Sequence, residues 1–187
     1  MDHQGYDISP TRALIPRLQR LLYAFRTTGY PIYHTREGHR PDLSTLSPRE
    51  LHRSKNNPSG LGIGYHGPLG RLLIRGEPGH DTIPELYPLA HENVIDKPGR
   101  GAFAHTEFEL MLRLKGVRNL VLAGVTTDVC VSSTMREAND RGFDCLLLED
   151  GTAAVEEDLR VGTCKSVRME GGVFGATATV EEIMKAL

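Results

Sequence analysis

The sequence lacks the features that mark membrane, secreted and disordered proteins. It has no apolar run near the ~20 residues that a membrane-spanning helix needs. No basic segment followed by an apolar one opens it, so we expect no signal peptide. Hydrophobic residues make up 39% and charged residues 25% of the 187 residues, which is typical of a folded globular chain. The length leaves room for one α/β domain.

Cysteine is scarce, and the common cofactor motifs are missing. Cys130, Cys145 and Cys164 form no CxxC pair, which argues against a disulfide framework and indicates a reducing compartment such as the cytoplasm. The eight histidines follow no zinc-binding spacing. The glycine patterns typical of dinucleotide and P-loop sites are absent. We therefore expect no metal and no organic cofactor.

The sequence also has no strong excess of one charge. Its 22 Lys and Arg nearly balance 24 Asp and Glu, which gives a net charge of -2. We therefore expect no nucleic acid and no membrane among the partners.

Apolar segments alternate between the spacing of strands and that of helices. Strands are predicted over residues 31–35, 93–96, 119–125, 144–149 and 172–174. Helices are predicted over residues 10–29, 106–115, 128–141, 155–168 and 180–187. Strands separated by helices indicate an α/β fold with a doubly wound, mostly parallel sheet. Thr106 and Glu109 predict a capping box at the second of these helices.

Residues 36–92 interrupt this alternation. They carry seven prolines and many glycines, and a long irregular segment in a compact domain is usually a lid or a binding loop. The sequence therefore predicts a single domain over residues 1–187, with 36–92 as a long loop excursion.

The stretch GVTTDVCV places Cys130 just after a buried strand, in the first turn of a helix. Ligands bind at the carboxyl ends of the strands in open parallel sheets. Free N–H groups and the helix dipole stabilise a thiolate and an oxyanion there. Cys130 is therefore a candidate nucleophile, although a free cysteine is as often a small core residue. Cys145 and Cys164 fall inside a strand and a helix, where core positions are expected.

Other polar side chains are predicted at the same end of the sheet. Lys97 follows the strand at 93–96, so its charge could stabilise a neighbouring thiolate; a surface lysine is the alternative. Arg36, Glu37 and His39 follow the strand at 31–35 and are candidates for substrate binding. Phe103 is either a wall of the pocket or a packing residue.

Two segments resemble the isochorismatase-like cysteine hydrolases: IDKPGRGAF at 95–103 and AGVTTDVCVSSTMREANDRGFDCLLLEDGTAA at 123–154. Within that family the likeness is to biuret hydrolase and the ureido-amidohydrolase group, through GYDIS, HTREGHRPDL, RGEPGHDTIPELYP and MEGGVFG. It runs over nearly the whole chain. It implies a three-layer α/β fold and a homo-oligomer, either a dimer or a tetramer.

The resemblance also implies a mechanism. Cys130 would attack the carbonyl of a small linear amide or ureide, and water would release the resulting thioester, with Lys97 assisting. Backbone N–H groups of Thr126 and Cys130 would form the oxyanion hole, and the family's cis peptide maps to Val125–Thr126. The mechanism needs no metal and no cofactor.

The sequence departs from the family at two places. The resemblance implies a catalytic triad of Asp, Lys and Cys, of which Lys97 and Cys130 match the last two members. In the family the Asp ends a first strand that precedes the segment matching Gly5–Ser9, so we expect the sheet to lack this central strand; Asp2 is poorly placed to replace that Asp. Glu170 stands where biuret-hydrolase-like sequences tend to carry Gln. An ionised Glu only accepts hydrogen bonds, which would favour substrates with N–H donors if this residue lines the pocket; a solvated loop residue is the alternative.

The unmatched Asp keeps other functions open. The chain is alternatively a truncated, non-catalytic homologue that binds a small ligand or acts through oligomer assembly. A redox sensor at Cys130 is a third possibility, although no resolving cysteine lies nearby in the sequence.

Overall fold

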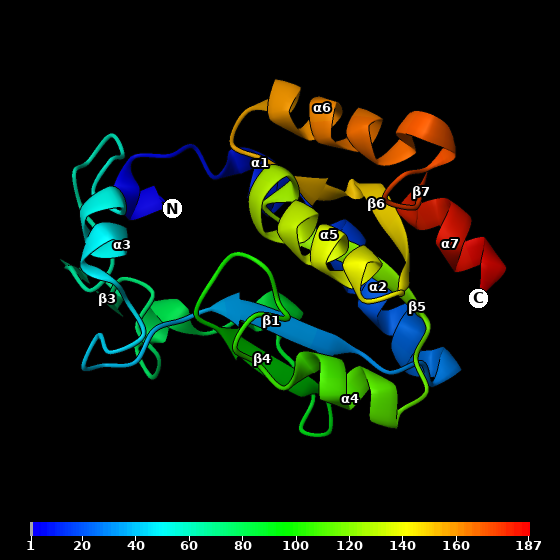
Figure 1. Ribbon diagram of the computed structural model, residues 1–187, viewed down its shortest axis with the longest axis horizontal. Coiled ribbons are helices and arrows are strands. Elements are labelled where there is room, and N and C mark those ends of the chain that lie inside the picture. Colours follow the sequence, from blue (N-terminus) through cyan, green and yellow to red (C-terminus); the bar gives the residue numbers. More distant parts are fainter. Residues whose placement is uncertain (1) are drawn as a thin grey trace.

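The computed structural model describes residues 2–187 as parallel strands with helices on both faces (Figure 1). The parallel strands are β1 (Tyr33–Glu37), β4 (Asn93–Lys97), β5 (Asn119–Val125), β6 (Asp144–Ala153) and β7 (Ala176–Ala178). The helices are α1 (Ser9–Ala13), α2 (Ile15–Thr28), α3 (Pro48–Arg53), α4 (Phe108–Leu114), α5 (Ser132–Asp140), α6 (Glu157–Arg168) and α7 (Val180–Ala186). This arrangement confirms the predicted α/β fold. None of the described helices is long and apolar enough to cross a membrane.

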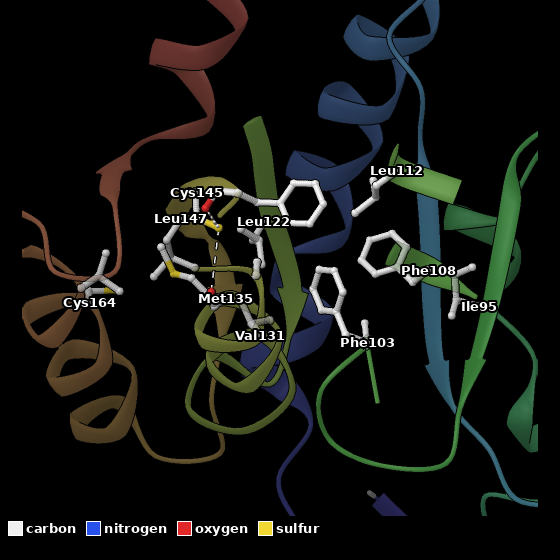
Figure 2. Packing of buried hydrophobic residues seen from close by; sticks show 14 residues of the cluster. Ile95, Phe103, Phe108, Leu112, Leu122, Val131, Met135, Cys145, Leu147 and Cys164 are labelled. Atoms are coloured by element: carbon white, nitrogen blue, oxygen red, sulfur yellow. Dashed lines mark hydrogen bonds between the residues drawn. The ribbon is translucent and has the colours of Figure 1, made fainter. Parts of the chain in front are cut away.

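The parallel strands form two separate groups. β1 pairs with β4, β5 pairs with β6 and β6 with β7, and within residues 2–187 no strand joins the two groups. Figure 2 shows β5 and β1 running in the same direction as the facing edges of the groups. The expected break in the sheet is therefore present in this part of the chain.

Two layers of helices cover the strands because side chains alternate between the two faces of each strand. On one face, α4, α5 and α6 pack on Leu122, Cys145 and Leu147. On the other face, α2 and α7 pack on Leu146 and Leu148. The strands are thus apolar on both sides, as expected for a buried parallel sheet.

Aromatic side chains connect the two strand groups. Phe103 lies between β5 and β1 (Figure 2), with its ring centroid 4.9 Å from that of Phe108 and 5.8 Å from that of Phe143. Tyr33 of β1 contacts Phe108 at 5.4 Å. Ile95 of β4 and Leu122 of β5 belong to the same buried cluster. Packing here joins strands that share no backbone hydrogen bonds.

An ion pair ties α2 to the group of β1 and β4. Both carboxylate oxygens of Glu92 accept hydrogen bonds from the Arg26 guanidinium, at 2.7 and 2.9 Å. His34 Nε2 of β1 lies 2.8 Å from Glu92 Oε2. The Glu92 side chain is only 3% exposed, so this pair is a buried anchor rather than a surface contact.

The excursion is more ordered than a loop. It contains α3, a short antiparallel pair of strands, β2 (His66–Gly67) and β3 (Gly70–Arg71), and 3-10 turns at Pro78–His80 and Pro84–Leu86. The 3-10 turn Asp2–Gln4 lies against it, with Gln4 Nε2 donating to the carbonyl of Leu61. Figure 1 shows this N-terminal segment beside α3, away from the parallel strands.

Several predicted boundaries shift for local reasons. The helix predicted over 10–29 is broken at Leu14 into α1 and α2, because Pro16 occupies the first turn of α2. The strand predicted over 172–174 is wrong. The chain turns there, and the strand starts at Ala176. Gly175, at φ 128, precedes the strand and lies so close to the Cys145 carbonyl that a Cβ at this position would be 2.1 Å from the carbonyl oxygen. Only glycine fits there.

The predicted capping box at Thr106 is also wrong. α4 begins at Phe108, and its N-cap Glu107 makes no side-chain cap hydrogen bond. The Thr106 hydroxyl donates to the carbonyl of Ala102 instead, and Glu109 pairs with Arg141 at 3.0 Å. A capping box is found at Thr179 and Glu182 of α7.

The Glu92 anchor predicts an acid-sensitive fold. The hydrogen bond from Arg26 lowers the pKa of Glu92 from 4.5 to about 2. A depressed carboxylate pKa stabilises the fold above pH 4.5, and this contribution is lost as the pH falls towards 2. We expect Glu92→Gln to lower the free energy of unfolding by roughly 2–3 kcal/mol at pH 7 in urea titrations. Glu85→Gln, at the exposed Arg12 pair, should change it by less than about 1 kcal/mol; equal losses would contradict a buried anchor.

The split between the strand groups predicts uneven amide exchange. β6 is paired on both sides, whereas β1 is paired only with β4 in the part of the chain described. We therefore expect the amides of Leu146, Leu147 and Leu148 to exchange far more slowly with deuterium than those of β1. Mass spectrometry of peptides from the native protein measures this difference. Equal protection would show that a further strand covers the free edge of β1.

Candidate active site at the carboxyl ends of the strands

Cys130 lies in the turn that follows β5. The Val125–Thr126 peptide bond is cis, and Thr127–Val131 then forms one π-helical turn that continues into α5. The Val131 N–H donates to the Thr126 carbonyl at 3.0 Å. The earlier N–H groups of this turn have no carbonyl of a preceding helical turn to bind, so they are free to face a ligand. Cys130 is half-buried.

The two other cysteines are poor nucleophiles. Burial raises the pKa of Cys145 to about 12, and the charge of Asp144 adds to the effect. Burial also raises the pKa of Cys164. Both lie in the apolar cluster, as predicted from their positions in the strand and the helix. They remain neutral thiols at physiological pH.

Lys97 ends β4 and points towards Cys130. Its side chain is 2% exposed, and Nζ lies 3.4 Å from Cys130 Sγ. Nζ also donates a hydrogen bond of 2.8 Å to the carbonyl of Gly99. A buried ammonium needs an opposite charge nearby, and a thiolate at Cys130 would supply one. This contact joins the two strand groups, because Lys97 and Cys130 belong to different ones.

Glu37 is the second acidic neighbour of Lys97. β1 extends two residues beyond the predicted strand, so Glu37 pairs in register with Lys97 of β4. Glu37 Oε2 lies 3.8 Å from Lys97 Nζ. His39 is fully buried, with Nε2 3.8 Å from Glu37 Oε1 and Nδ1 3.3 Å from the Thr45 hydroxyl. The structure thus brings Glu37 and His39 together with the Lys97–Cys130 pair.

Arg36 lies elsewhere. As the strand neighbour of Glu37 it points to the opposite face, where Nε donates to Asp96 at 2.5 Å and an Nη to Asp81 at 2.6 Å. His80 Nε2 lies 3.5 Å from Asp96. A cavity of about 210 Å³ borders this cluster. The Arg36 guanidinium therefore forms ion pairs with two carboxylates on the face away from Lys97.

Two further candidates are Phe103 and Glu170. Phe103 is 5% exposed and packs inside the core. Glu170 is exposed in the turn Met169–Gly171 after α6. That turn precedes β7, whose first residue pairs with Leu146 near the start of β6, so Glu170 lies near the amino ends of the strands. Within one chain, Glu170 and Cys130 are at opposite ends of the sheet.

A larger cavity lies beside Pro98 and Gly99, which follow Lys97 in the chain. It has a volume of about 490 Å³, and its walls come from Ser44–Ser47 of the excursion and from Pro98, Gly99, Ala104 and His105. Sequence reasoning missed the lining residues Ser44–Ser47 and His105. The run of hydroxyls in DLSTLS, shortly after the strand that carries Glu37, was the available signal. Among residues 2–187, no group of three or more His, Cys, Asp or Glu side chains is placed to hold a metal ion.

Comparison with known proteins places the chain in a family. The Isochorismatase domain matches residues 2–182. The chain belongs to the isochorismatase family. It is 30% identical to the ureidoacrylate amidohydrolase RutB of Azorhizobium caulinodans over 188 residues, which covers the whole chain and 82% of that protein.

Two further similarities agree with this assignment. The RutB protein of Yersinia enterocolitica is 30% identical over 154 residues. The matched part covers 81% of this chain and 66% of the length of that relative. The structure of an isochorismatase-like hydrolase from Alkaliphilus metalliredigens superimposes with a TM-score of 0.71 and 27% identity, covering 92% of this chain and 82% of that one. The predicted membership of this family and its likeness to ureido-amidohydrolases are thereby confirmed.

The environments of the three cysteines predict selective labelling. In the native protein at about pH 7.5, one thiol should react rapidly with a disulfide reagent such as DTNB, because Cys145 and Cys164 are buried with raised pKa values. Cys130→Ala should abolish the rapid reaction, and Cys164→Ala should leave it unchanged. Three thiols should react once the protein is unfolded. Rapid reaction of a second thiol in the native protein would contradict this assignment.

Proposed function

We propose that this chain is a cysteine amidohydrolase that cleaves a C–N bond of a small linear amide or ureide of the biuret type. The observation that carries the proposal is the 3.4 Å approach of the buried Lys97 ammonium to the sulfur of the half-buried Cys130. A cation at this distance stabilises a thiolate, which is the nucleophilic form of cysteine. Similarity to ureidoacrylate amidohydrolases supports the substrate class.

The reaction proceeds in two stages. The Cys130 thiolate attacks the substrate carbonyl, and the N–H groups of Thr126 and Cys130 stabilise the oxyanion. The C–N bond breaks, and the nitrogen leaves with the proton that the thiol has given up. Water then attacks the thioester, the carboxylic acid departs, and the proton of the water returns to the sulfur. No metal or organic cofactor takes part in either stage.

The cavity beside Pro98 and Gly99 is the proposed substrate entrance. Ser44–Ser47 form one wall and Pro98 and Gly99 the other, and the Gly99 carbonyl already binds Lys97 Nζ. The excursion over 36–92 would act as the lid of this entrance. Hydroxyl groups on its wall suit an uncharged polar substrate. Of the other candidates, Glu37 and His39 would contribute from the Lys97 side.

We also propose a cytoplasmic homo-oligomer. Three free cysteines suit a reducing compartment. The outer edges of β4 and β7 have no strand partner within residues 2–187, which favours association with another chain. A dimer or a tetramer would satisfy this requirement.

The split sheet favours a second candidate function. A chain whose strand groups share no hydrogen bonds in the described region could bind a small ligand, or act through assembly, without turnover. In that case Cys130 would react with electrophiles once but would not hydrolyse amides repeatedly.

Ammonia release distinguishes the two functions. We expect steady release from biuret or a ureidoacrylate-like amide, and a loss of at least about a hundredfold in kcat for Cys130→Ala and for Lys97→Met. Cys164→Ala serves as the matched cysteine control and should retain the rate. Stoichiometric labelling of Cys130 without any turnover by the folded protein would favour the binding homologue.

A further inference from the structure

The Lys97 ammonium is shared between two acidic groups. Cys130 Sγ approaches Nζ at 3.4 Å from the end of β5, and Glu37 Oε2 approaches it at 3.8 Å from the end of β1. At 2% exposure, Lys97 has almost no water to screen either contact. The steps of the proposed reaction use only the contact with sulfur, and what the Glu37 carboxylate contributes from the Lys97 side is not specified by them.

Glu37 carries its negative charge at neutral pH. Burial acts to raise its pKa, but the approach of His39 and the charges of Lys97 and Arg100 outweigh burial, and the pKa of Glu37 is lowered from 4.5. His39 is fully buried on the other side of the carboxylate, with Nε2 3.8 Å from Glu37 Oε1 and Nδ1 3.3 Å from the Thr45 hydroxyl. Glu37 is therefore an anion next to Lys97, whose Nζ also contacts the nucleophile.

Two anions next to one buried cation compete for it. A thiolate at Cys130 forms beside a carboxylate that already neutralises part of the Lys97 charge, and like charges in one buried cluster disfavour each other's ionised form. We propose that Glu37 sets the pH range over which Cys130 reacts, by sharing the Lys97 ammonium with it. Glu37 acts through Lys97 and is a positioning residue. Its catalytic consequence rests on the proposed amidohydrolase function, but its effect on the thiol does not.

Other charged groups surround this cluster, and His39 is the titratable one that lies directly against Glu37, with Nε2 3.8 Å from Oε1. Arg100 follows β4 and pairs with Glu50 of α3. Arg75 of the excursion donates to the carbonyls of Gly38 and Asp96. Asp128 lies on the same turn as Cys130, and within the part of the chain described its Oδ1 is buried without a hydrogen-bond partner. A Glu37 variant leaves the residues at all of these positions unchanged, so a difference from wild type reports the loss of the Glu37 carboxylate.

The test is the pH dependence of Cys130 alkylation by iodoacetamide in the full chain, from about pH 5 to about pH 10. Glu37→Gln removes the charge at nearly constant size, so the alkylation midpoint should fall by about one pH unit and labelling at about pH 6 should become several-fold faster. Glu37→Asp keeps the charge but moves it further from Lys97, because the side chain is one methylene shorter. This variant should give an intermediate midpoint. Glu181→Gln, an exposed carboxylate on α7, should leave the midpoint unchanged.

The alkylation midpoints of the variants decide whether Glu37 controls the reactivity of Cys130. An unchanged or higher midpoint in Glu37→Gln overturns the proposal, as does loss of labelling altogether, which indicates a purely structural role. If Glu37→Gln does not fold, the lower midpoint of Glu37→Asp carries the test, and an unshifted one overturns it. Ammonia release is followed in parallel: its absence in wild type refutes the amidohydrolase while the alkylation shift is still measurable. In an active enzyme, the acidic limb of kcat/KM should move with the alkylation midpoint.

Discussion

Side-chain packing, rather than backbone hydrogen bonding, holds the two strand groups of residues 2–187 together. β1 and β5 face each other without a ladder between them, and the rings of Tyr33, Phe103 and Phe108 lie where the two groups meet. Hydrogen bonds in a ladder fix register within a fraction of an ångström, whereas apolar contacts tolerate small sliding movements. The Arg26–Glu92 pair adds a directional constraint from the opposite face. The N–H groups of Ala102 and Phe103 add hydrogen bonds to Thr134 and Glu137 of α5, and these contacts together set the relative position of the groups.

The candidate site depends on the same contacts. Cys130 belongs to the group of β5, whereas Glu37 and Lys97 belong to the group of β1 and β4. The 3.4 Å distance between Nζ and Sγ is thus a distance between two bodies rather than within one. Placing the nucleophile and its cation on different elements is common where ligands bind at strand ends. In this protein, the packing between the two strand groups therefore determines how closely the Lys97 ammonium approaches the Cys130 thiol.

Much of this architecture could be predicted from the sequence. Apolar runs located the strand at 119–125 to the residue. Cys130 and Lys97 became candidates because each was expected near the carboxyl end of a strand, and the structure brings them to 3.4 Å. The extension of β1 to Glu37 was not predicted, because it follows from pairing with β4 rather than from the residues of β1 themselves. The position of Arg36 was missed for a related reason. The strand was predicted to end before Arg36, but β1 includes it, and its side chain forms ion pairs on the face away from Lys97.

Other features depend on contacts that no local pattern encodes. The buried His39 meets the Thr45 hydroxyl through the path of the excursion, which carries no periodic signal. Glu170 was grouped with Cys130 by likeness alone, and the connection through α6 carries it to the far end of the strands. The capping box predicted at Thr106 failed because the chain before α4 is held by a different hydrogen bond. Tertiary contacts overrode local propensity in each case.

The interface between the strand groups has a consequence for how this protein is judged in solution. Each group keeps its own backbone ladder, so a movement of one against the other would leave the far-ultraviolet circular dichroism spectrum almost unaltered. The same movement would separate sulfur from ammonium. A preparation can therefore look fully folded by its secondary structure and still contain few competent molecules, and the fraction of titratable fast thiol is the better count of usable protein.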